Sequence, residues 1–245
     1  MLGRSLRNGR ALPERLRRGS CPICQHQTLF VRTGAWLRDN YFCISCLSVP
    51  RYRALIQVLQ QSFPNWRALK IYESASSGAA SEKLRREAAG YVGSQYYPNV
   101  PSGRMYRGFR SENLQRLSFP DDSFDLVVTQ DVFEHVMEPA SGFTEIERVL
   151  RPGGAHVFTV PLYPRPRTVK RAHLAGKVIV HDLPPDYHEN PVDQSGSLVV
   201  HEWGHDLPDQ IAAWTSLETE IIRLHAPQWG VVGEFTEVVI SRKRG

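Results

Sequence analysis

LSFPDDSFDLVVTQDVFEHVMEPASGFTEIERVLRPGGAHVFTVP, residues 117–161, is the stretch that decides the fold. Its segment FDLVVTQ is a short, Val-rich apolar run after an acidic turn, as expected of a strand buried on both faces. Apolar residues then recur at helical spacing from Phe143 to Leu150, and RPGG (151–154) is a stop signal for that helix. AHVFTV predicts a second buried strand. A strand, helix and strand of this length predict a right-handed crossover in a parallel sheet.

The length and composition are those of a globular protein. The chain has 245 residues, 41% of them hydrophobic, which is enough to bury one domain with or without a small module. No apolar run approaches the roughly 20 residues of a spanning helix. Residues 1–20 carry six arginines and one glutamate without an apolar core, so they predict a basic tail and a cytoplasmic protein rather than a secretory signal. An organellar transit peptide is the alternative.

The net charge of +5 is concentrated at the two ends of the chain. Residues 1–20 carry +5 and residues 242–244 carry +3, so the residues between them carry −3. A strongly basic surface is the usual requirement for nucleic-acid binding. The body of the chain lacks that charge, so we expect no nucleic-acid partner.

The four cysteines all lie in the first fifth of the chain, as Cys21-Pro-Ile-Cys24 and Cys43-Ile-Ser-Cys46 with 18 residues between them. Two C-x-x-C turns at this spacing are typical of a Cys₄ zinc ribbon, whose closed tetrahedron leaves no position for catalysis. Disulfides or a redox pair are the alternatives, and a reducing compartment argues against disulfides. We predict that Cys21, Cys24, Cys43 and Cys46 hold a structural Zn²⁺, which so small a segment needs in order to fold.

The stretch 117–161 also resembles the second half of a class I S-adenosylmethionine-dependent methyltransferase, of the type 11 kind. The shared pattern is FP-D-x-SFDLV, a D-V-x-EH turn, E-x-x-RVLRPGG and a strand ending in Pro, with weaker matches from Leu69 to Lys243. The resemblance implies an α/β, Rossmann-like sheet of seven strands that ends in an antiparallel hairpin. Two C-x-x-C turns before an Arg-rich helix resemble a subgroup with an N-terminal zinc ribbon.

The resemblance implies that S-adenosylmethionine lies across the ends of the first strands. LKIYES (69–74) is the predicted first strand, YVGSQYY (91–97) the second and MYRGF (105–109) the third. In the family an acid and three glycines follow the first strand, whereas here Glu73 is kept and Ala75, Ser77 and Ala79 replace the glycines. Gln95 stands where an acid usually binds the ribose. The implied cofactor residues are Glu73, Ser74, Ala75, Ser76, Ser77, Gly78, Gln95, Tyr96, Glu112, Asn113, Leu114, Asp131, Val132 and Phe133.

The segment 161–205 follows the fifth predicted strand and contains five of the nine histidines. In this fold, an insertion at that place lies over the carboxyl edge of the sheet and shapes the acceptor pocket. A hydroxyl acceptor must lose its proton, and a histidine with a reference pKa near 6.5 suits that role. The candidate bases are His135, His188 and His201.

His201-Glu202-Trp203-Gly204-His205 fits the H-E-x-x-H pattern of zinc proteases. That chemistry needs both histidines on one helix face, but Gly204 and Pro208 interrupt a helix there. The sequence instead predicts a strand that ends near His201 and a helix that begins near Asp206.

These observations predict methyl transfer from S-adenosylmethionine to an oxygen or nitrogen of a small-molecule or glycan acceptor, with no membrane partner. An RNA or protein methyltransferase is the first alternative, in which Arg32, Trp36, Arg38 and Tyr41 of the ribbon would grip the substrate. A non-catalytic binding or scaffold module is the second, because the glycines of the cofactor loop are replaced. The predicted organisation is a basic tail (1–19), a zinc ribbon (20–50), a linking helix (51–66) and a methyltransferase domain (67–245) with an acceptor-side insertion (161–205).

Overall fold

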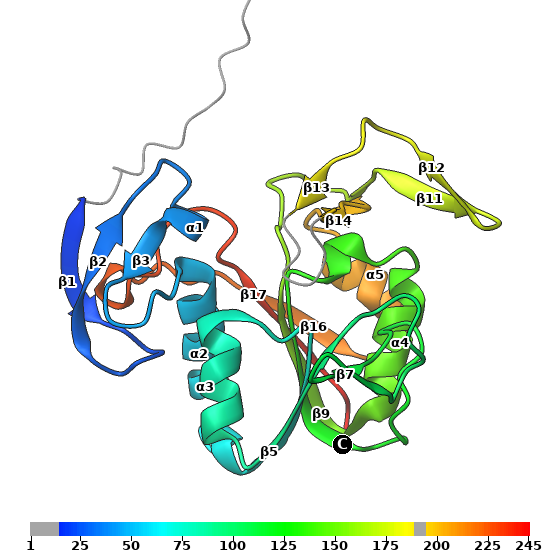
Figure 1. Cartoon of the computed structure of the whole chain (residues 1–245), viewed down its shortest axis with the longest axis horizontal. Helices are drawn as coiled ribbons and strands as arrows, with labels where there is room; N and C mark the ends of the chain where they lie inside the picture. The colour runs from blue at the N-terminus through cyan, green and yellow to red at the C-terminus, as the bar shows by residue number, and fades with distance from the viewer. Residues whose placement is uncertain (1–14, 189–194) are drawn as a thin grey trace, which may run out of the picture.

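The computed structural model describes residues 15–188 and 195–245, and its centre is one mixed sheet of eight strands (Figure 1). The order is β16-β17-β9-β8-β4-β5-β7-β6, in which β17 and β6 run antiparallel to their neighbours. The strands are β4 (Lys70–Ser74), β5 (Gly90–Gln95), β6 (Met105–Tyr106), β7 (Phe109–Ser111), β8 (Phe124–Gln130), β9 (Leu150–Thr159), β16 (Glu218–Ile222) and β17 (Val238–Arg242). The predicted α/β sheet with an antiparallel C-terminal pair is confirmed.

The sheet differs from the predicted seven strands because the third predicted strand is a hairpin. Arg107 and Gly108 both adopt positive φ, at 49° and 80°, and turn the chain between β6 and β7. Such a pair is the usual requirement of a two-residue hairpin turn that matches strand twist. Only β7 runs parallel to β5, and β6 adds an eighth strand at the edge.

The predicted helix between the two strands of residues 117–161 is α4 (Pro139–Val149), and its end differs from the prediction. The helix ends at Val149 and β9 begins at Leu150, so the RPGG segment belongs to the strand. Gly153 has a φ of +77°, and a Cβ on Gly154 would lie 2.9 Å from the Asp125 carbonyl oxygen of β8. These glycines therefore let the bulged start of β9 approach β8, rather than stop the helix.

Helices cover both faces of the sheet and enclose two apolar cores (Figure 1). Alternate residues of β8 enter different cores, with Leu126 and Val128 in one and Val127 in the other. The first core lies under α2 (Pro50–Ser62) and α3 (Gly78–Glu87), and the second under α4 and α5 (Leu207–Trp214). No helix of the described part of the chain is long and apolar enough to cross a membrane.

The N-terminal module is a three-stranded antiparallel sheet, β1 (Leu16–Ser20), β2 (Gln27–Arg32) and β3 (Tyr41–Cys43), with the short helix α1 (Leu37–Asn40). Most of the predicted basic tail lies outside the described residues. The predicted end of this tail at residue 19 is wrong, however, because Leu16 already pairs with Val31 as part of β1. The predicted linking helix is α2, which ends at Ser62 rather than at residue 66 because Pro64 follows.

The insertion folds into short antiparallel pairs above one end of the sheet (Figure 1). Its strands are β10 (Val169–Lys170), β11 (Ala172–Ala175), β12 (Val178–His181), β13 (Tyr187–His188), β14 (Ser197–Leu198) and β15 (His201–Glu202). Since β15 is a strand and α5 begins at Leu207, the two histidines of the H-E-x-x-H pattern do not share a helix.

The ribbon and the main domain share one core, and Arg53 of α2 joins them. Its side chain is 0% exposed. It donates to the carbonyl oxygens of Tyr41 (2.7 Å), Gly230 (2.8 Å) and Ser48. Gly230 lies in the loop between β16 and β17, where a Cβ would come within 2.8 Å of the Phe30 ring of the ribbon. The loop that joins the last two strands is therefore anchored on the ribbon.

We predict that Arg53→Met lowers the free energy of unfolding by about 3 kcal/mol, because three buried carbonyl oxygens lose their donor. The measurement is urea unfolding of the zinc-loaded protein, with the exposed Arg85→Met as the matched control. Equal stability of the two variants would contradict the structural role given to Arg53.

Candidate functional site

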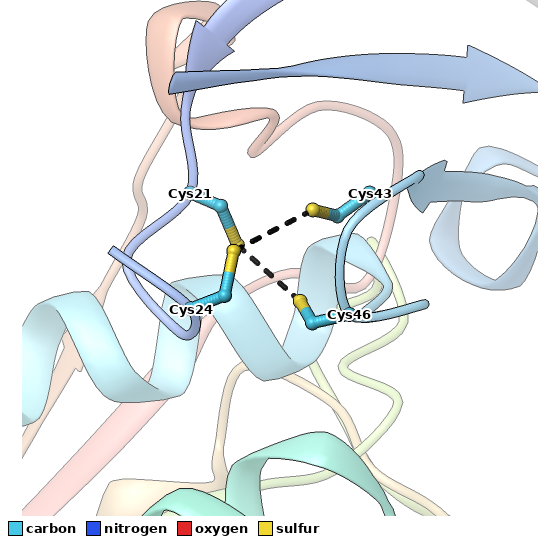
Figure 2. A group of neighbouring side chains, drawn as sticks. All are labelled: Cys21, Cys24, Cys43 and Cys46. Atoms are coloured by element: carbon cyan, nitrogen blue, oxygen red, sulfur yellow. Dashed lines mark hydrogen bonds between the residues drawn. The ribbon is translucent and has the colours of Figure 1, made fainter. Parts of the chain in front are cut away.

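The four cysteine sulfurs converge from the two knuckles (Figure 2). Cys21 Sγ lies 3.7 Å from Cys46 Sγ, and Cys24 Sγ lies 3.9 Å from Cys43 Sγ. A tetrahedron with Zn–S bonds of about 2.3 Å has edges of about 3.8 Å, whereas a disulfide needs about 2.05 Å. The donor set and its spacing therefore fit a four-coordinate zinc ion.

The surroundings of the cysteines also suit a zinc tetrathiolate. Cys21 Sγ and Cys46 Sγ lie 3.5 and 3.2 Å from Ser48 Oγ. Zn²⁺ with four thiolates carries a net charge of −2, and the buried guanidinium of Arg53 has no carboxylate partner among residues 15–188 and 195–245. Burial lowers the pKa of Arg53 to about 10, and the negative charge of the thiolates opposes that shift. A zinc tetrathiolate would supply the counter-charge.

A pocket of about 660 Å³ opens at the carboxyl ends of β4, β5 and β8, where open α/β sheets bind ligands. Four regions line it: the loops after these three strands, the segment after β7, the first turn of α2, and the insertion. The lining residues are Arg51, Tyr52, Ser74, Ala75, Ser77, Gln95, Tyr96, Glu112, Asn113, Leu114, Gln115, Gln130, Asp131, Val132, His135, Val136, Met137, Leu174 and Ser197.

Most of the residues predicted to bind the cofactor line this pocket. Four of them do not, namely Glu73, Ser76, Gly78 and Phe133. Phe133 is fully buried and stacks on Phe143 with 4.0 Å between ring centroids, so it packs α4 against the sheet. Glu73 is likewise fully buried, whereas Gly78 is exposed at the start of α3.

Glu73 supports the loop after β4 from below. Its carboxylate accepts hydrogen bonds from Ser81 Oγ (2.7 Å), Tyr91 Oη (2.6 Å) and Gln130 Nε2 (2.5 Å). Burial raises the pKa of Glu73 despite these donors. Because Ser81 belongs to α3 and Gln130 ends β8, the carboxylate ties the pocket loop to both elements.

The amide of Gln95 is oriented by the same loop. Its Nε2 donates to the Ser76 carbonyl oxygen at 2.8 Å, while the Ser76 amide donates to the Ser94 carbonyl oxygen at 3.1 Å. The donor of the side chain is therefore used internally. Oε1 is the acceptor that Gln95 can offer to a ligand in the pocket.

Glu112 and Asn113 are held in place before any ligand binds. Glu112 is buried and pairs with Arg110 Nε at 2.7 Å. Asn113 Oδ1 accepts the Gln115 amide at 2.9 Å, which leaves its Nδ2 donors for a ligand. Tyr96 is half exposed and borders the pocket beside them.

Asp131 is held by two arginines from outside the main domain. Its carboxylate accepts from Arg38 Nη2 at 2.6 Å and lies 3.0 Å from Arg51 Nε, and Thr159 Oγ1 donates to it at 2.9 Å. Burial would raise the pKa of Asp131, but the charges of Arg38 and Arg51 outweigh burial and lower it. Asp131 is therefore an anion that faces the pocket while paired with α1 and α2.

Two of the three candidate bases lie together. The ring centroids of His135 and His188 are 5.2 Å apart, and His135 Nδ1 lies 2.9 Å from the Leu198 carbonyl oxygen. That bond fixes Nδ1 as the donor and leaves Nε2 free to accept a proton. Burial lowers the pKa of His135 to about 4, so its ring is neutral near pH 7.

The third candidate base, His201, does not lie with the other two in the pocket. His201 is 6% exposed and stacks on Trp203 with 5.0 Å between ring centroids. Its ring is therefore packed on a side chain of the second apolar core, to which Trp203 belongs. The insertion reaches the pocket through Leu174 and Ser197.

Glu134 is a buried carboxyl group near the pocket that lacks hydrogen-bond partners among the described residues. Its side chain is 1% exposed, and neither carboxylate oxygen has a hydrogen-bond partner in the described chain. Burial, and then the charge of Asp131, raise the pKa of Glu134 well above its usual range. Ligand atoms of Glu134, His135 and His188 lie within 4.8 Å of one another, so this group could also hold a metal ion.

Arg51 and Tyr52 line the pocket, although the sequence pattern does not predict this. The Arg-rich start of α2 predicts only a helix that links two domains. Most of the ribbon residues that were candidates for binding a macromolecule are buried or packed. Arg38 and Tyr41 are buried, and Trp36, which is 45% exposed, packs on Phe235.

We predict one zinc ion per chain, bound by the four cysteines. Metal analysis of protein purified under reducing conditions without added zinc should give about one equivalent, and Cys24→Ser should lower this content and the stability together. A metal-free protein of unchanged stability would contradict the assignment.

We predict that Glu134→Gln stabilises the protein at neutral and alkaline pH. The folded pKa of Glu134 is raised, so the stability that its protonated form contributes is complete below pH 4.5 and is lost as pH rises through the folded pKa. Glutamine cannot ionise, and each unit of pKa difference corresponds to about 1.4 kcal/mol. Urea unfolding from pH 5 to 9 measures the difference, and the exposed Glu138→Gln should follow the wild type.

Comparisons with known proteins agree with this geometry. Residues 75–158 match the family model described as Methyltransferase domain. A ubiquinone biosynthesis O-methyltransferase from Cereibacter sphaeroides is 28% identical over 135 residues, which cover 52% of this chain and 53% of that protein. A probable S-adenosylmethionine-dependent methyltransferase from Mycolicibacterium smegmatis is 44% identical over 52 residues, 21% of this chain and 20% of that one.

Among solved structures, the chain is similar to an S-adenosylmethionine-dependent methyltransferase from Mesorhizobium loti. The TM-score is 0.50 with 18% identity, over 78% of this chain and 98% of the other. The chain spans about half the length of the first curated relative it matches. Residues 75–158 are therefore similar to a methyltransferase domain, and the chain has the fold of S-adenosylmethionine-dependent methyltransferases with a four-cysteine module before those residues.

Proposed function

We propose that this protein transfers a methyl group from S-adenosylmethionine to a hydroxyl or amine of a small-molecule or glycan acceptor. The observation that carries the proposal is the pocket at the carboxyl edge of the sheet. Three polar groups converge on it from three consecutive strand ends, namely the loop from Ser74 to Ser77, Gln95, and the pair Glu112 and Asn113. A ligand with an amino-acid end, a ribose and an adenine matches that series.

The roles of the chain's own residues follow from their hydrogen bonds. Gln95 Oε1 would accept from the ribose hydroxyls, and Asn113 Nδ2 would donate to the adenine. Leu114 supplies an apolar surface beside them. Because each polar side chain is already oriented, binding would cost little ordering entropy.

The acceptor side of the pocket is formed by His135, Met137, Leu174 and Ser197. When bound, the cofactor supplies an electrophilic methyl group, and the protein has to align the acceptor and exclude water. For a hydroxyl acceptor, His135 Nε2 would take the proton, since Nδ1 is engaged with the Leu198 carbonyl oxygen. The Cereibacter relative is named as an O-methyltransferase, which supports a hydroxyl acceptor.

We expect S-adenosylhomocysteine to bind the zinc-loaded protein, and Gln95→Ala to weaken binding about tenfold. The variant removes an acceptor and the donor that anchors Ser76, and a tenfold loss corresponds to about 1.4 kcal/mol. Calorimetric titration measures both affinities, and the exposed Gln61→Ala on α2 is the matched control. A folded wild-type protein that gives no binding would favour the scaffold alternative and overturn the proposal.

A further inference from the structure

The first turn of α2 joins the cysteine cluster to the pocket within a few residues. The second knuckle ends at Cys46, α2 begins at Pro50, and Arg51 and Tyr52 line the pocket. Tyr52 packs directly on the loop after β4, where a Cβ on Gly78 would lie 2.7 Å from Tyr52 Oη. The position of the knuckle therefore sets the position of one pocket wall.

A second connection runs through the segment between the knuckles. Arg38 of α1 donates to Asp131 Oδ1 and also, from Nε, to the Phe235 carbonyl oxygen at 2.8 Å. Arg51 approaches the other oxygen of Asp131 from α2. Both cations that neutralise this pocket carboxylate thus come from elements that flank Cys43 and Cys46.

Those elements depend on the metal for their arrangement. The ribbon strands are three to six residues long, and a module of this size lacks the core to fold without a metal. Without the ion, four neutral thiols would replace the charged centre that faces Arg53. The hydrogen bonds that Arg53 donates join β3, Ser48 and Gly230. Loosening of this junction would release Arg38 and Arg51 and leave Asp131 as an unpaired carboxylate beside Glu134.

We propose that the zinc module is an integral wall of the cofactor pocket, through Arg51, Tyr52 and the pairing of Arg38 and Arg51 with Asp131, so that zinc occupancy controls cofactor affinity. The inference rests on the proposed function for the identity of the ligand. It assigns the ribbon to the binding of the cofactor rather than to the grip of a macromolecular acceptor.

The test measures S-adenosylhomocysteine affinity by calorimetry in three states of the full chain: zinc-loaded, stripped with a chelator under reducing conditions, and reloaded with zinc. The metal content is measured in each state. We expect at least a tenfold loss of affinity on stripping and recovery on reloading. Two variants of the zinc-loaded protein accompany it, Arg51→Ala and, as matched control, Arg85→Ala, which breaks an exposed ion pair.

The Arg51→Ala variant tests the role of the pocket wall even if removal of zinc unfolds the chain. It should keep one equivalent of zinc and lose at least tenfold in affinity, while Arg85→Ala binds as the wild type does. Equal affinities of the two variants, or of a folded zinc-free protein and the loaded one, would overturn the inference. Absence of binding by the zinc-loaded wild type would instead overturn the proposed function.

Discussion

The carboxylate of Asp131, held by Arg38 and Arg51, is the interaction on which the site depends. It lies just past the end of β8 with a φ of +52°, a conformation that is costly for a residue with a Cβ. The two arginines and Thr159 compensate that cost by fixing the side chain. Since the arginines come from α1 and α2, the same contacts attach the ribbon to the carboxyl edge of the sheet. Residues from both modules therefore form the pocket.

Buried charge is distributed so that each group has a distinct means of compensation. Asp131 has cations, Glu73 has three hydrogen-bond donors, and Arg53 has carbonyl oxygens with the thiolate cluster behind them. Glu134 has none of these, and burial drives it toward its neutral form. When Glu134 is neutral, no second negative charge lies beside Asp131. The attraction between Asp131 and the two arginines is therefore preserved.

The sequence was most informative where local pattern and tertiary context agree. Residues 117–161 predicted the strand, helix and strand because their apolar spacing is imposed by burial in a parallel sheet. The spacing of the cysteines predicted that they form a cluster, because each C-x-x-C pair is a local feature of the sequence. Tyr52 as a pocket residue was not predictable, since it depends on how α2 docks. The burial of His201 was not predictable for the same reason, because it depends on which face of a two-residue strand meets the core.

The replaced glycines of the cofactor loop also have an explanation in this docking. A glycine at position 78 is required because Tyr52 of α2 occupies the space that a Cβ would need, and its φ of +78° suits glycine. Ala75 adopts positive φ as well, at 54°, which costs about 1 kcal/mol relative to glycine. Glu73 offsets such strain by tying the strand end to Ser81 and Gln130. Small side chains thus suit the backbone of this loop, and its glycine at position 78 is required by the packing of Tyr52 from the helix that follows the four-cysteine module.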